Sequence, residues 1–105
     1  MSTQNRPGDL FEQLMAIASD AFTSRRFSVA YHLLAAAYHC ASDNKNESQL
    51  YIVERTAREQ LQWIDANASD YEHSTKSAAS RNHISIFKIL SQQASIKLRF
   101  LGLGQ

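Results

Sequence analysis

The longest apolar stretch of the chain is the fifteen-residue run from Phe27 to Ala41, which only three polar side chains interrupt. If this run is helical, one face carries hydrophobic residues at i, i+3, i+4 and i+7, and Val29, Leu33 and Cys40 cover much of the opposite side. A helix that is apolar nearly all round is buried by other helices, and this one is too short to span a membrane. We therefore expect it to be the central helix of the protein.

Three further segments carry the spacing of amphipathic helices. Asp9 begins the first, and the short polar break from Thr23 to Arg26 predicts an antiparallel hairpin with the central helix. Asn46 or Ser48 is expected to cap a third helix, whose apolar stripe recurs every three or four residues as far as Tyr71. The four predicted helices span residues 9–24, 27–42, 48–71 and 82–101.

The polar segment 73–81 is expected to be a loop or a weak helical turn. Residues 96–100 alternate between apolar and basic side chains, as a strand would, but no turn residues separate them from the helical pattern before them. We therefore predict helix there, ended by Gly102 and Gly104. The expected buried residues are Leu14, Ala18, Ala30, Leu34, Ala37, Leu61, Ile64 and Leu90.

Length and composition agree with one helical domain. The chain has 105 residues, of which 44% are hydrophobic, and it has only three glycines and one proline. These are too few for the many turns that a sheet needs. We predict an all-α fold, either a four-helix antiparallel bundle or helical hairpins. Residues 1–8 are expected to be a flexible leader, residues 9–101 the domain, and residues 102–105 a tail.

Residues 11–44 resemble a single tetratricopeptide repeat. The family's first-helix positions, turn aromatic and two small second-helix residues correspond here to Leu14, Ile17, Ala18, Phe27, Ala30 and Ala37. The family's tyrosine, second aromatic and closing proline are replaced by Ala21, Leu34 and Ser42. One repeat length further on, isoleucines occupy the positions of the small residues. The resemblance implies one repeat-like helical hairpin, which favours a protein-binding module over an array of repeats.

A second resemblance is to HEPN-type helical bundles, many of which are ribonucleases or partners of nucleotidyltransferases. Arg25 and Arg26 precede His32 at the spacing of that family's Arg-to-His motif. The resemblance implies His32 as a general base and an arginine on a phosphate. We rank it well below the first, because Phe27 replaces the polar residue that usually stands beside the arginine.

The sequence offers no set of residues for a metal, a cofactor or catalysis. His32 and His39 lie about 10 Å apart along one helix, too far to share one metal ion, and we interpret them as core or boundary residues. Cys40 is the single cysteine and is interpreted as a small core residue. No glycine-rich phosphate loop or nucleophile motif is present. We therefore expect a protein that is not an enzyme.

The formal net charge of +1 hides an asymmetry along the chain. All ten Asp and Glu lie in residues 1–72, whereas residues 73–105 carry five Lys and Arg. Such a split indicates either an anionic partner, such as nucleic acid, or a basic last helix that lies beside an acidic earlier one. The N-terminus lacks the layout of a signal peptide, so we expect a cytoplasmic protein without a membrane segment.

These patterns favour a small helical protein that binds protein, most simply a second copy of itself in a two-fold dimer. The third and fourth helices are expected to supply the contact, because large aromatics beside a polar face are typical interface anchors. The alternative is a nucleic-acid-related protein that uses the basic C-terminal helix, or a ribonuclease that uses Arg26 and His32. The candidate interaction residues are Tyr51, Trp63, Lys88, Lys97 and Arg99.

Overall fold

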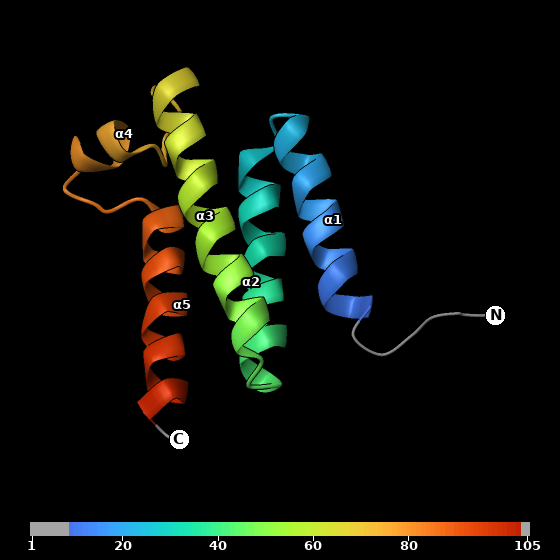
Figure 1. Cartoon of the computed structure of the whole chain (residues 1–105). Coiled ribbons are helices and arrows are strands. Elements are labelled where there is room, and N and C mark those ends of the chain that lie inside the picture. The colour runs from blue at the N-terminus through green and yellow to red at the C-terminus, as the bar shows by residue number, and fades with distance from the viewer. Residues whose placement is uncertain (1–8, 104–105) are drawn as a thin grey trace.

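The computed structural model describes residues 9–103, and every regular element among them is a helix (Figure 1). The predicted all-α fold is therefore confirmed. The expected leader, residues 1–8, and the last two residues of the expected tail lie outside the described part of the chain. The helices are α1 (Asp9–Thr23), α2 (Phe27–Asp43), α3 (Glu47–Asn67), α4 (Thr75–Ala79) and α5 (Ile86–Leu103).

The two tight connections, after α1 and after α2, are closed in the same way. After α1, the peptide N–H of Arg26 donates to the carbonyl oxygen of Ala21 at 2.8 Å. Arg25, between them, has a φ of 64°, and Lys45 after α2 has a φ of 51°. Helices commonly end in this way, usually with glycine at the positive-φ position. Because each connection reverses the chain within a few residues, consecutive helices become antiparallel neighbours.

The helices form two antiparallel hairpins, α1 with α2 and α3 with α5, which pack together mainly through α2 and α3. In Figure 1, α3 lies in front of α2, α5 lies at the left and α1 lies at the right. The α2 helix is central, as the sequence predicts, because α1, α3 and α5 all pack against it. The Cα atoms extend over 45 × 37 × 17 Å, so the arrangement is flat and has two broad faces.

The core follows the predicted helical stripes. Small residues of α2, among them Ala30, Ala37 and Ala41, are fully buried, which allows the neighbouring helices to approach closely. Among the predicted core residues, Leu14 is only half-buried, whereas the other seven are buried. Leu14 lies on α1. Because α1 packs mainly against α2, no other helix covers much of the surface of α1.

The third helix begins as predicted but ends earlier. The side chain of Asn46 caps α3 by accepting from the peptide N–H of Gln49 at 3.0 Å. The prediction that this helix reaches Tyr71 is wrong, since α3 ends at Asn67. Tyr71 instead lies in the following turn, where its ring centroid is 5.2 Å from that of Phe27. Its apolar ring fits the helical stripe in sequence, but it packs on α2 from outside the helix.

The segment between α3 and α5 contains a short helical turn, one of the two conformations expected for residues 73–81. This turn is the short helix α4, whose N-cap Ser74 accepts from the peptide N–H of Ser77 at 3.1 Å. The predicted helix start at residue 82 is wrong, because α5 begins at Ile86. Asn82 has a φ of 61°, a left-handed conformation that the right-handed helix does not allow.

The last helix ends later than predicted, at Leu103 instead of residue 101. Residues 96–100 are helical, as expected, despite their alternating pattern. Gly102 does not end the helix, because α5 continues to Leu103. Gly104, the other predicted terminator, lies outside the described residues.

A polar contact links α3 to α5. Glu54 on α3 accepts from Ser91 on α5 at 3.0 Å and from Arg58 at 3.0 and 3.3 Å. The hydrogen bond from Arg58 is the main reason that the pKa of Glu54 is lowered; the Ser91 bond adds to this, and partial burial opposes it. A lowered pKa in the folded state stabilises the fold above the unfolded-state pKa of a glutamate, about 4.3.

We expect this stabilisation to disappear as the pH falls through the lowered pKa of Glu54. Urea unfolding from neutral pH to about pH 3 should therefore show a larger loss of stability for the wild type than for Glu54→Gln. Glu12→Gln changes an exposed carboxylate on α1 and should follow the wild-type curve. If the wild type and Glu54→Gln lost equal stability as the pH fell, Glu54 would not be the source of this stabilisation.

Candidate interaction surface

The α1–α2 hairpin exposes large hydrophobic side chains. Leu10 is 60% exposed, and Ile17 and Val29 are also exposed. Their direction follows from the helical rotation of about 100° per residue. Ile17 points about 140° away from Phe22, whose ring centroid lies 5.5 Å from that of Trp63 on α3. The exposed side chains of this hairpin therefore lie on the side of the molecule opposite α3.

Exposed hydrophobic residues on α5 share this side. Phe100 is 69% exposed, and Ile89 and Ile96 are also exposed. At the same rotation per residue, all three point about 140–180° away from Ser91. Ser91 bonds to Glu54 of α3, so these side chains also point away from α3. We call this surface the back face, and its exposed hydrophobic residues are Leu10, Ile17, Val29, Ile89, Ile96 and Phe100.

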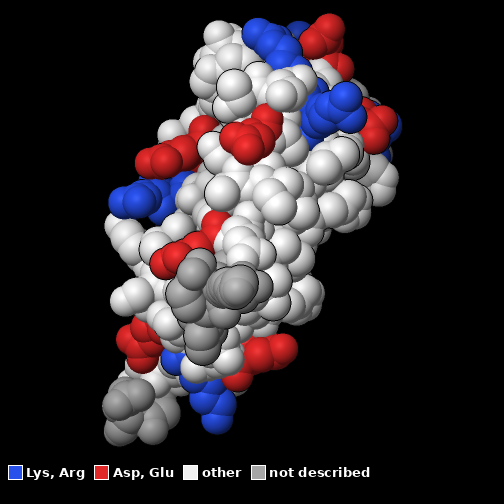
Figure 2. Space-filling view, turned by 90° about the vertical axis from the view of Figure 1, so that its right-hand side faces the viewer, with Lys and Arg blue, Asp and Glu red and all other residues white. Residues whose placement is uncertain are grey.

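The back face is poor in charge where α2 crosses it. No Lys, Arg, Asp or Glu occurs from Phe27 to Ser42. Figure 2 looks at the α1 edge of the molecule, and charged side chains gather there at the two ends and over the left half. The right-hand edge, where the back of the Figure 1 view comes into sight, is uncharged between the ends. Lys97 of α5, which is half-buried, borders this face.

Two histidines are part of the back face. The interpretation of His32 and His39 as core or boundary residues is wrong, because both side chains are exposed. They point about 120–140° away from Phe27, whose ring lies 6.0 Å from that of Trp63 on α3. Helical spacing could not show this, since α2 has apolar residues on nearly every side.

Trp63, a predicted anchor, lies mostly within the fold. Its ring centroid is 5.5 Å from that of Phe22 on α1 and 6.0 Å from that of Phe27 on α2. The guanidinium of Arg25 lies 5.0 Å from the ring centroid. Only 36% of Trp63 is exposed, so the ring mainly joins three helices.

The other predicted interaction residues do not form one patch. Tyr51 is exposed on α3, with the guanidinium of Arg55 5.7 Å from its ring centroid. Lys88 and Arg99 share one side of α5 but lie about 16 Å apart along it. Lys97 is nine residues from Lys88, which places it about 180° away on the opposite side. The five residues therefore do not share one face of the molecule.

The residues of the ribonuclease-like motif lie on the surface, apart from any cleft that the structure describes. Arg26 and His32 are both exposed, and Arg25 is engaged with Trp63. Within residues 9–103, no three His, Cys, Asp or Glu side chains gather closely enough to hold a metal ion. None of the helices in the described range is long and apolar enough to cross a membrane.

Comparisons with known proteins identify no relative of this chain. No family model, no curated protein and no solved structure matches this chain.

Proposed function

We propose that this protein is a non-catalytic helical module that acts through protein–protein contact, and that its partner is a second copy of itself. The observation that supports this is the back face, where six large hydrophobic side chains of α1, α2 and α5 are exposed on one side. Monomeric proteins rarely expose a contiguous apolar area of more than a few hundred Å². We place the module in the cytoplasm, where its single cysteine would stay reduced.

The size of the face fits a dimer contact. A standard interface buries about 800 Å² on each partner. The broad faces of this flat molecule, whose Cα atoms extend over 45 × 37 Å, are large enough for such a contact. Burial of apolar area at about 25 cal/mol per Å² would supply the driving force.

The chemistry of the face favours an identical partner. In a two-fold contact the same patch occurs on both sides, so a patch that is poor in charge meets another such patch, and no complementary charges are needed. A nucleic acid would instead need a basic surface, and Lys97 lies on the opposite side of α5 from Lys88 and Arg99. The back face, rather than Tyr51 and Trp63, is therefore the contact that we propose.

Charged substitutions on this face test the proposal. Ile17→Glu and Ile96→Glu would each place a carboxylate twice in the interface, and burying an unpaired charge is costly. We expect the dimer dissociation constant to rise at least tenfold, which corresponds to about 1.4 kcal/mol. Size-exclusion chromatography over a range of protein concentrations measures the shift.

The matched control is Tyr51→Glu, which adds the same charge at an exposed position on α3. It should leave the dissociation constant unchanged. An equal effect of Tyr51→Glu and Ile17→Glu would place the contact elsewhere, and circular dichroism of each variant checks that the fold is retained.

A further inference from the structure

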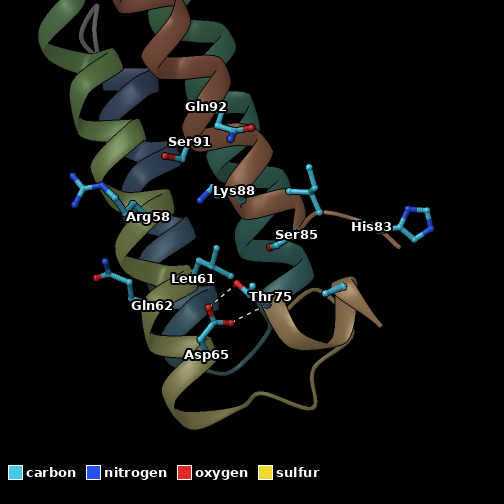
Figure 3. A pocket seen from close by; sticks show the side chains of 12 residues that line it. Arg58, Leu61, Gln62, Asp65, Thr75, His83, Ser85, Lys88, Ser91 and Gln92 are labelled. Carbon is cyan, nitrogen blue, oxygen red and sulfur yellow. Dashed lines mark hydrogen bonds between the residues drawn. The ribbon is translucent and has the colours of Figure 1, made fainter. Parts of the chain in front are cut away.

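A cleft lies between α3, α4 and the first turns of α5, away from the back face (Figure 3). Its volume is about 570 Å³, within the range of roughly 300–1,000 Å³ that is usual for small-molecule sites. Leu61 forms part of its wall and is nearly buried, and Ile84 is 60% exposed beside it. The cleft thus offers an apolar surface on which a compact hydrophobic group could pack.

The charged residues that line the cleft differ in whether they already have a partner within the protein. Arg58 already holds Glu54 through its Nε and Nη2 atoms. Both carboxylate oxygens of Asp65 accept from Thr75, one from the peptide N–H at 2.9 Å and the other from the hydroxyl at 2.7 Å. Lys88, in contrast, forms no ion pair with any residue in the described range, 9–103. Lys88 is therefore the lining cation without an ion-pair partner among the described residues, whereas the carboxylate of Asp65 is held by Thr75 at the α4 end of the cleft.

Polar groups lie close to this lysine. In Figure 3 the side chains of Lys88 and Ser91 extend from α5 toward α3, and Ser85 lies one turn earlier on the same wall. Ser85 is buried and accepts from the peptide N–H of Phe87 at 3.2 Å, which leaves its own hydroxyl proton free to donate. An ammonium and a hydroxyl donor beside an apolar wall suit a ligand with an anionic group on a hydrophobic body.

We propose that this cleft binds a small organic anion, in which one carboxylate or phosphate group contacts Lys88 and a compact apolar body packs on Leu61 and Ile84. The cleft lies on α3, α4 and α5, and its exposed wall is separate from the proposed dimer contact. The proposal therefore stands independently of self-association.

Amide NMR titration of the full chain tests this proposal with phenyl phosphate and benzoate as probes. We expect saturable shifts at the amides of Leu61, Ser85 and Lys88, with a dissociation constant in the millimolar range or tighter. The stronger of the two probes identifies the anionic group. Inorganic phosphate, which lacks the apolar body, and phenol, which lacks the strong anion, should each bind at least fivefold more weakly.

Two lysine variants test whether Lys88 is the cation that contacts the anionic group. Lys88→Gln should weaken phenyl phosphate binding at least fivefold, whereas Lys97→Gln, on the opposite side of the same helix, should leave it unchanged. Absence of saturable shifts in the wild type would overturn the proposal. Equal affinities in the wild type and Lys88→Gln would do so as well, and tight binding of inorganic phosphate alone would exclude the apolar contact.

Discussion

Phe87→Ala is expected to lower the free energy of unfolding by about 3–5 kcal/mol. Phe87 is fully buried near the start of α5, in a cluster with Phe27 of α2 and Ile64 of α3. Its ring centroid also lies 5.7 Å from that of Tyr31 on α2. Removal of the ring leaves a cavity where three helices meet, and the rigid surroundings can close it only partly.

Urea unfolding followed by circular dichroism measures this loss. Phe100→Ala is the matched control, because it removes the same ring from the same helix at a position that is 69% exposed. At a protein concentration below self-association, the control should change stability by no more than about 0.5 kcal/mol. If the two variants lost equal stability, the assignment of Phe87 to the core would be wrong.

Ala37→Leu is expected to destabilise the protein by about 1–3 kcal/mol through overpacking. Ala37 lies in the middle of the central helix and has no exposed surface. A leucine there would push apart helices that approach α2 closely because its buried residues are small.

The same urea experiment measures this effect, and Ala16→Leu is its control. Ala16 is exposed on α1, so the longer side chain can extend into solvent and should change stability by no more than about 0.5 kcal/mol. An unchanged unfolding curve for Ala37→Leu would show that no close helix crossing exists at this position.

The helices that could be predicted from sequence are those with uninterrupted periodic stripes. The bounds of α1 and α2 match the predicted ones to within one residue, because strong apolar spacing is flanked by short polar breaks. The polar breaks also locate the two turns, but they do not show how the backbone closes them. Their positive-φ positions hold Arg25 and Lys45, and neither is the glycine that usually marks such a turn.

The region from residue 68 to residue 85 shows where periodicity fails. Tyr71 continues the apolar spacing of α3, but the helix ends first and the ring packs on Phe27 from a turn. The end of α3 and the capping of α4 depend on side chains such as Asn67 and Ser74. Asn and Ser occur both in loops and at helix ends, so their presence alone does not fix a boundary.

The candidate surface could be predicted only in part. The sequence shows that the central helix is apolar on almost every side, which implies that it needs cover from several directions. It cannot show which side the other helices leave open, because that depends on how α3 and α5 pack against α2. Trp63 illustrates the difficulty, since a ring that lies off the helical stripe can contact other helices of the same chain.

Sedimentation equilibrium of the purified chain at micromolar concentration tests the central claim most directly. The chain has a mass of 11.9 kDa. The proposed contact between two back faces predicts twice that mass for the wild type, and the mass of a single chain for the double variant Ile17→Glu/Ile96→Glu at the same concentration. A wild-type mass equal to that of one chain would contradict the proposed self-association.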